Sequence, residues 1–229
     1  MAHIRKLVPI AFVSALLMAA CGPTPSTPLT SAAFHGDAAQ VKTLLATTSA
    51  DTAADGWTPL IWAVRGSRVE VMTLLLDAGA DPNRPDQRRG WTPLMHALHT
   101  AHGDAARLLL ARGADGARGA GGNSPLEMAA LDNDVDLIGR LLAAQPSRDQ
   151  QLRAFDLAVA GGALVDIDRP LLGSCHTEAV RVLLASDPSL ASRGDGPWPP
   201  IWWARRQGCR EVIALVAAAN RANMAQKTP

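Results

Sequence analysis

The chain has few charges, few aromatic side chains and few cysteines, and these shortages exclude several classes of protein. Only 19% of its 229 residues are charged, and 22 basic against 21 acidic residues leave a formal charge of +1. Nucleic-acid-binding proteins normally carry a clear basic excess, so no nucleic-acid partner is expected. Three cysteines are too few for a disulfide-dense mini-protein, and 48% hydrophobic residues are too many for a disordered chain. The composition also excludes a coiled coil and a polytopic membrane protein.

A long apolar run is also lacking, because the run at the start of the chain is too short to cross a bilayer. It spans residues 7–20 and so has 14 positions, whereas a transmembrane helix needs about 20. Arg5 and Lys6 precede it, as in the basic flank of a secretory signal. The run ends in Leu-Met-Ala-Ala-Cys at 17–21, which resembles the lipobox of bacterial lipoproteins.

The lipobox resemblance implies that residues 1–20 are removed as a signal peptide and that Cys21 becomes the lipidated first residue. Two or more acyl chains hold a protein stably on a bilayer, whereas one binds only marginally. Residues 21–26 then serve as a tether, and Gly22 in place of an aspartate favours the outer over the inner membrane. We therefore expect a periplasmic protein that touches the membrane only through its anchor. The alternative is an ordinary cleaved signal in which Cys21 is a plain thiol.

A short motif recurs through the rest of the chain at steps close to 33 residues. Thr-Pro-Leu begins at positions 27, 58 and 92, Ser-Pro-Leu at 124 and Pro-Pro-Ile at 199. An alanine follows each start by five positions: Ala32, Ala63, Ala97, Ala129 and Ala204. Gly-Ala-Asp at 79–81 and 113–115 follows two of the starts by 21 positions. Together these features resemble the ankyrin repeat, whose signature begins Thr-Pro-Leu-His-x-Ala.

The long step between positions 124 and 199 contains one further unit. Phe155 and Ala158 stand at its Leu and Ala positions, counted from Arg153, and its second helix starts 13 residues late. The 46 residues from Arg153 to Pro199, less these 13, return the period of 33. We therefore predict an insertion, around 163–175, between the two helices of the fifth unit.

The resemblance implies an all-α ankyrin-repeat solenoid of six helix-turn-helix units with short hairpin loops. Thr or Ser caps each first helix, Pro follows as its first residue, and the small Ala lets the paired helices approach closely. No unit can bury its apolar face alone, so stability is expected from stacking. The repeat domain is predicted over 27–223, with a polar tail at 224–229. Its units are 27–57, 58–91, 92–123, 124–152, 153–198 and 199–223.

The position that holds His in the motif is occupied by other residues in all six units. These are Thr30, Ile61, Met95, Glu127, Asp156 and Trp202. The family's usual inter-repeat hydrogen bonds from His are therefore expected to be absent, with looser or differently satisfied packing, chiefly in the fifth unit.

Ankyrin proteins bind partners on a concave surface made by the hairpin tips and the exposed face of each first helix, and the resemblance implies such a surface here. The candidate partner-binding residues are Phe34, His35, Trp57, Arg65, Arg88, Arg89, Trp91, His99, Leu131, Asp132, Trp198, Arg206 and Gln207. Trp and Arg are enriched among the residues that dominate binding energy. Three Trp at one position, in a chain with six Trp and no Tyr, favour a binding ridge. The alternative is that they only pack one hairpin on the next.

Charge is unevenly distributed along this surface. Five arginines lie in the second and third units: Arg65, Arg68, Arg84, Arg88 and Arg89. Five aspartates lie in the fourth and fifth units: Asp132, Asp134, Asp136, Asp166 and Asp168. Such a surface could orient a partner of opposite polarity; the alternative is a set of solvated turns of mixed sign.

Two cysteines remain once Cys21 is assigned to the lipid, and the periplasm is an oxidising compartment in which disulfides persist. Cys175 and Cys209 lie nine and ten positions into neighbouring units, at turns that stacking places side by side. We therefore predict a Cys175–Cys209 bridge that pins the insertion to the last repeat. Cα atoms more than about 7 Å apart would exclude the bond and leave two thiols.

Neither a metal site nor a catalytic site is expected. His96, His99 and His102 are spaced by threes, and two of them could share a metal ion on a helix. However, His96 is expected to point inward and His102 to lie in a turn. Gly-Asn-Ser-Pro at 122–125 lacks the second Gly of a nucleophile elbow, and the adjacent Cys175 and His176 do not form a triad. No cofactor is predicted.

The function that follows is a non-enzymatic protein–protein interaction module, monomeric and lipid-anchored in the periplasm. A sharper version is an immunity-type inhibitor of a toxin delivered into the periplasm. A competing version is an accessory factor for a periplasmic enzyme in oxidative-stress defence. A different class is a metal or small-ligand carrier that uses the three histidines His96, His99 and His102.

Overall fold

The computed structural model describes residues 24–160, 175–192 and 199–227. Within these ranges the chain forms twelve α-helices and one short 3-10 helix, with no strand longer than an isolated bridge. The all-α solenoid expected from the repeats is thereby confirmed. The predicted signal segment with Cys21, most of the insertion, and Trp198 lie outside the described residues. Within the described ranges no helix has the length and apolar character needed to cross a membrane.

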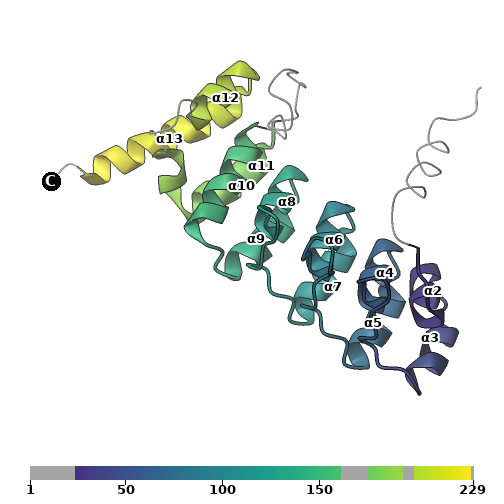
Figure 1. Ribbon diagram of the computed structural model, residues 1–229. Coiled ribbons are helices and arrows are strands. Elements are labelled where there is room, and N and C mark those ends of the chain that lie inside the picture. Colours follow the sequence, from purple (N-terminus) through teal and green to yellow (C-terminus); the bar gives the residue numbers. More distant parts are fainter. Residues whose placement is uncertain (1–23, 161–174, 193–198, 228–229) are drawn as a thin grey trace, which may run out of the picture.

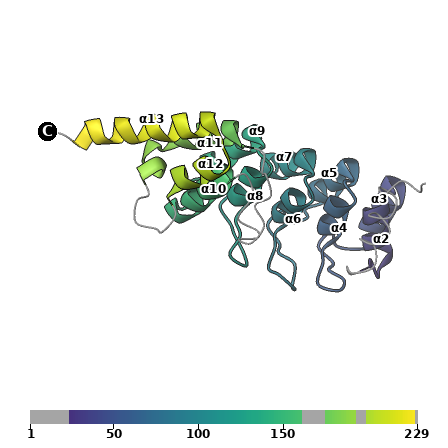
Figure 2. The same cartoon turned by 90° about the horizontal axis from the view of Figure 1, so that it is seen from above.

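Each repeat is a pair of helices, and the pairs stack side by side into an elongated, curved array (Figure 1). The first helices are α2 (Pro28–His35), α4 (Pro59–Arg65), α6 (Pro93–His99), α8 (Pro125–Leu131), α10 (Arg148–Ala160) and α12 (Pro200–Arg206). The second helices are α3 (Ala38–Leu45), α5 (Val69–Asp77), α7 (Gly103–Ala111), α9 (Val135–Ala143), α11 (Thr177–Ser186) and α13 (Arg210–Lys227), and the 3-10 helix η2 (Pro188–Ser192) follows α11. Figure 2 shows the first helices in one row and the second helices in another, with loops between repeats projecting from the first-helix side.

The Thr or Ser before each Pro caps its helix as predicted. The Thr58 hydroxyl oxygen accepts a hydrogen bond from the Ile61 N–H at 3.2 Å, and Thr92 does the same for Met95 at 3.3 Å. Each cap satisfies one of the backbone donors that a helix N-terminus leaves free. The last repeat begins with Pro199, which makes no side-chain cap.

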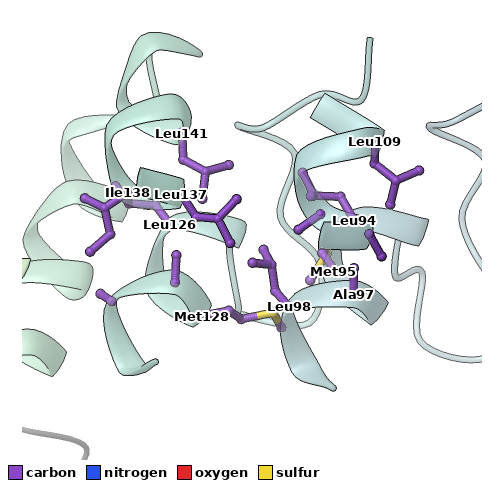
Figure 3. Close-up of a cluster of buried hydrophobic side chains, with 14 of the residues drawn as sticks. Leu94, Met95, Ala97, Leu98, Leu109, Leu126, Met128, Leu137, Ile138 and Leu141 are labelled. Atoms are coloured by element: carbon purple, nitrogen blue, oxygen red, sulfur yellow. The ribbon is translucent and has the colours of Figure 1, made fainter. Parts of the chain in front are cut away.

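The core is a continuous layer between neighbouring repeats. Figure 3 shows it between the third and fourth repeats, where Leu94, Leu126 and Ile138 have no exposed surface. The alanines five positions into these repeats, Ala97 and Ala129, are also fully buried. A larger side chain at either place would have to displace packed neighbours, which is why a small residue recurs there.

The turn between the two helices of a repeat places one residue in the left-handed region. This residue lies nine positions after the repeat start in five of the six repeats: Gly36, Ser67, Ala101, Asn133 and Gly208. Three of the five carry a side chain at φ 54°, a conformation that costs a non-glycine residue about 1–2 kcal/mol. Stacking therefore holds these three turns against a local preference.

The hairpin loops are as short as expected. Asp55 and Gly56 both have positive φ, at 54° and 81°, and the bridge Ala54↔Trp57 closes around them. Two adjacent residues with positive φ between paired backbone positions make the type I′ hairpin turn, for which Asp-Gly is a favoured sequence.

Helices α10 and α13 extend beyond the bounds of the predicted repeat units. Helix α10 begins at Arg148, five residues before the predicted start of the fifth unit, because Ser147 and Gln150 form a capping box there. Helix α13 continues to Lys227, so residues 224–227 of the predicted polar tail are helical. No glycine or proline interrupts 210–227, and its alanines favour a helix.

Hydrogen bonds between repeats are present, and they come from positions other than the His position of the motif. The first residue beyond the inter-helix turn reaches back to a carbonyl of the preceding repeat: Arg68 Nε donates to Phe34 O at 3.1 Å, and His102 Nδ1 contacts Val64 O at 3.0 Å. His176 Nδ1 makes the same contact with Ala130 O at 3.0 Å. The packing between repeats is therefore satisfied differently from the motif, by Arg68, His102 and His176.

The predicted disulfide is present. Cys175 and Cys209 are bonded, with their Cα atoms 5.8 Å apart. Cys209 is buried and Cys175 is exposed, and the bond joins the turn before α11 to the turn before α13. It thus links the irregular fifth repeat to the sixth.

Candidate functional site

The candidate site lies on the first three repeats, where aromatic rings form a continuous row. Phe34 contacts Trp62 edge to face, with ring centroids 5.7 Å apart, and Trp57 lies 4.9 Å from Trp62. Trp57 is also 4.8 Å from the imidazole of His96, which in turn lies 5.6 Å from Trp91. The row therefore runs from the first repeat to the third. We call these five residues the aromatic row.

The indoles of the row are mostly covered. Trp57 is 7% exposed and Trp91 8% exposed. Most of each indole therefore packs within the chain, as in the alternative in which the hairpins pack on one another. Partner contact through their remaining edges stays a prediction, and Trp198, the third of the set, lies outside the described residues.

A buried ion–imidazole pair anchors the hairpin above the row. Asp86 is 3% exposed, and one carboxylate oxygen accepts the backbone N–H of Arg88 at 2.8 Å and of Arg89 at 2.6 Å. The other accepts a hydrogen bond from His96 Nε2 at 2.8 Å. Burial alone would raise the pKa of Asp86, but these three hydrogen bonds together lower it. Burial lowers the pKa of His96, so the pair is an aspartate beside a neutral imidazole at neutral pH.

Two guanidinium groups lie over the indole rings. The Arg65 Cζ is 4.9 Å from the centroid of Trp57 and 5.9 Å from that of Trp62, and the Arg89 Cζ is 5.0 Å from that of Trp91. Cations over aromatic faces are attracted by the ring quadrupole. Burial lowers the pKa of Arg65, and the like charge of Arg89 lowers it further. The two cations are therefore close enough to repel each other.

The other predicted contact residues occupy the C-terminal ends of the first helices. His35 and His99 are exposed; His35 contacts the Ser31 carbonyl at 2.8 Å, and the imidazole of His99 lies 5.0 Å from the ring of Trp91. Leu131 is half-buried, and Arg88 and Asp132 are exposed. In the last repeat, Arg206 lies over Trp202 at 5.3 Å and Gln207 donates to Ala160 O. The structure thus brings these residues to one face, but only those of the first three repeats share the aromatic row.

Two of the five aspartates in the predicted cluster are paired within the chain. Asp134 caps α9 and lies 2.9 Å from Arg107, and Asp136 lies 2.7 Å from the same side chain. Asp132 differs, because burial, and then the nearby Asp134, raises its pKa. Asp166 and Asp168 lie outside the part of the chain that the structure describes.

The hollow beside Asp132 is small. It has a volume of about 200 Å³ and lies between the third and fourth repeats, where Ala101 and His102 face Asp132 and Leu137. Drug-sized ligands usually occupy roughly 300–1,000 Å³. The three histidines do not converge: His96 bonds to Asp86 and His102 to a carbonyl, while His99 lies on Trp91. Across 24–160, 175–192 and 199–227, no three His, Cys, Asp or Glu side chains are placed to hold a metal ion.

Two family models match the chain: ankyrin repeats in three copies over residues 8–86 and a single ankyrin repeat over residues 89–118. The chain therefore contains ankyrin repeats, and its helical stack is an ankyrin-repeat solenoid. Repeats of this kind generally form non-enzymatic scaffolds for protein interaction, so the chain is a protein-interaction module.

Solved structures show the same architecture. An ankyrin repeat domain from Acinetobacter baumannii AYE matches with a TM-score of 0.68 and 25% identity, covering 84% of this chain and 97% of that one. A chain from the complex of the Bdellovibrio bacteriovorus predatory endopeptidase Bd0816 with the immunity protein Bd3460 matches at 0.64 and 19%, covering 85% and 99%. The human ASB11 ankyrin repeat domain matches at 0.64 and 24%, covering 85% and 84%. A search of curated proteins found no match.

Proposed function

We propose that this protein is a lipid-anchored periplasmic module that captures another protein on the concave surface formed by its first helices and hairpins. It works by holding or masking that partner, without catalysis. The proposal rests chiefly on one observation: Arg65 and Arg89 on this surface have no carboxylate partner in the described part of the chain, whereas the arginines on α7, α9 and α11 of the opposite row are paired.

The contrast concerns the ion pairs of arginines on the two sides of the stack. On the second helices α7, α9 and α11, the arginines pair with carboxylates: Arg107 with Asp134, Arg140 with Asp136 and Arg181 with Glu211. Arg65 and Arg89, on the first-helix side, have no carboxylate within 4.0 Å in the described part of the chain. Cations left without a partner on this surface are available to acidic groups of another protein.

Two observations support the location. The lipobox at 17–21 provides the anchor, and the Cys175–Cys209 disulfide suits an oxidising compartment. A Cys21→Ser change is expected to move the protein from the membrane fraction to the soluble periplasmic fraction. Unchanged membrane association would contradict the anchor.

The immunity-type version is supported by one comparison. A structural neighbour occurs in a complex of a predatory endopeptidase with an immunity protein, although at 19% identity the likeness itself extends only to the fold. In this version the concave surface covers a toxic enzyme that reaches the periplasm. The accessory role in oxidative-stress defence stays a prediction, and no geometry of the three histidines favours a metal carrier.

The test is affinity capture from the cell envelope with paired variants. His99→Glu with Arg206→Glu changes the proposed surface, and Gln40→Glu with Arg221→Glu makes the same change of charge on the second-helix row. We expect the first variant to lose the captured partner and the second to retain it. Equal capture by both would refute the surface. Inhibition of the captured partner's activity by stoichiometric protein would support the immunity version, and activation would support the accessory role.

A further inference from the structure

We propose that Arg65 and Arg89 form a clamp for the carboxylate side chains of an acidic segment in the partner protein. This inference rests on the proposed function and names the chemistry that its surface recognises. It concerns two side chains at the centre of the first three repeats.

Neither guanidinium group donates a hydrogen bond within the described part of the chain, and both lie against ring faces. Their positions come from contact with ring faces, at 4.9 Å over Trp57 for Arg65 and 5.0 Å over Trp91 for Arg89. A guanidinium has five N–H donors in a rigid plane that matches a carboxylate in two-point contact. Stacking fixes this plane in advance, so less conformational entropy is lost when an anion binds.

The acid in this hairpin cannot neutralise the two cations. The Asp86 side chain is 1% exposed, and its oxygens are engaged by His96 and by the backbone N–H groups of Arg88 and Arg89. His96 adds no negative charge. Arg65 and Arg89 therefore repel each other while free, and an anion that lies between them relieves that repulsion.

A carboxylate of a polypeptide suits the two arginines better than a phosphate of a nucleic acid. The cations sit over a row of rings, and Asp132 lies exposed farther along the same surface. A polyanion would meet repulsion there, and the chain has a formal charge of only +1. A protein segment can instead place its acidic residues on the clamp and basic ones near Asp132, which sets its direction.

The clamp is tested with the purified full-length protein and three probes: a capped hexaglutamate peptide, its hexaglutamine counterpart and inorganic phosphate. Binding is measured by calorimetry and by tryptophan fluorescence, since Trp57 and Trp91 underlie the clamp. We expect the glutamate peptide alone to bind, more weakly at high salt and about tenfold more weakly in Arg89→Gln. Arg221→Gln, an equal loss of charge on α13, should bind as the wild type does.

Arg65→Lys is the second variant, because it keeps the charge but loses the planar fork, and it should also weaken binding. Circular dichroism checks that each variant is folded; Arg89 is exposed, so its replacement leaves the core intact. No binding of the glutamate peptide, equal binding of both peptides, or phosphate binding that displaces the peptide would overturn the clamp. Envelope capture that Arg89→Gln leaves unchanged would also overturn it, while the proposed function would stand.

Discussion

The second and third repeats differ from the fifth and sixth in what holds them together. In the former, regular helix pairs α4–α5 and α6–α7 stack through buried side chains, capped helices and the Asp86–His96 pair. In the latter, the helices of the fifth repeat are separated by an insertion, and a disulfide and the Arg148–Asp187 ion pair add links. The second and third repeats contain no cysteine, and the Arg112–Asp77 ion pair joins the ends of α7 and α5.

The difference shows which charged side chains are not needed to hold the repeats together. In a repeat protein each unit is stabilised mainly by its neighbours, so one irregular unit weakens the stack locally. A covalent bond at that point compensates for it. In the regular repeats, Arg65 and Arg89 can stay unpaired without loss of stacking, and this leaves them for recognition.

The largest effect is expected at one position that carries Trp in both regions. Trp62 is 2% exposed, whereas Trp203, at the same place in the last repeat, is half-buried. Trp62→Ala should lower the free energy of unfolding by about 3–5 kcal/mol, and Trp203→Ala by about half as much or less. Urea unfolding followed by circular dichroism measures both. Trp62→Phe is the control that keeps a ring, and equal losses at the two sites would contradict the contrast.

The next effect removes the covalent link. Cys175→Ser with Cys209→Ser should cost about 2–4 kcal/mol, the usual range for a bond closing a loop of this length. Hydrogen exchange should accelerate in α11 and α13 and stay unchanged in α4–α7. Mild reduction of the wild-type protein should reproduce this pattern. Acceleration spread evenly over all repeats would mean that the bond does not act locally.

A pH change should weaken the regular repeats selectively. Burial lowers the pKa of His96 below the usual histidine value of 6.5, although the bond to Asp86 acts to raise it. The charge of Arg65 and the nearby His99 lower this pKa further. Below the usual value the unfolded chain binds a proton that the folded chain does not, so the free energy of unfolding falls as pH falls. Protection of α4–α7 against hydrogen exchange, corrected for the intrinsic pH dependence of amide exchange, should therefore fall as the pH is lowered from about 8 to about 5. In His96→Asn this slope should be reduced, and an unchanged slope would exclude His96 as its source.

The smallest effect compares one turn position in both regions. Ala101→Gly should stabilise the third repeat by about 0.5–1 kcal/mol, because Ala101 has φ 54° and glycine tolerates that region. Gly208→Ala should destabilise the sixth by about 1 kcal/mol from backbone strain alone, since an added Cβ would meet nothing within 4 Å. Thermal melting measures both, and shifts of the same sign would contradict the explanation.

Much of the fold could be predicted because its signals are local and repeated. The caps at Thr58 and Thr92 act within three residues, and a period of 33 places them. The start of α10 was missed, although Ser147 and Gln150 carry the Ser-x-x-Gln pattern of a capping box. The bridge between Cys175 and Cys209 could be predicted because stacking turns a sequence offset into proximity.

The candidate site was harder to predict, because its geometry depends on contacts between hairpins. The repeat position identified Trp57 and Trp91 but not their burial, which depends on the groups that cover them. The pairing of Asp86 with His96 joins residues that no motif relates. No sequence pattern shows that Arg65 and Arg89 lack a carboxylate partner among the described residues, because ion pairs between repeats depend on side-chain positions.

The bond between Cys175 and Cys209 also reports on the folding of the last two repeats. Docking of the last helix pair against the fifth repeat brings its two sulfurs together. Oxidation therefore marks molecules whose C-terminal end is finished, and a mixed population can be sorted by thiol labelling into completed and incomplete chains.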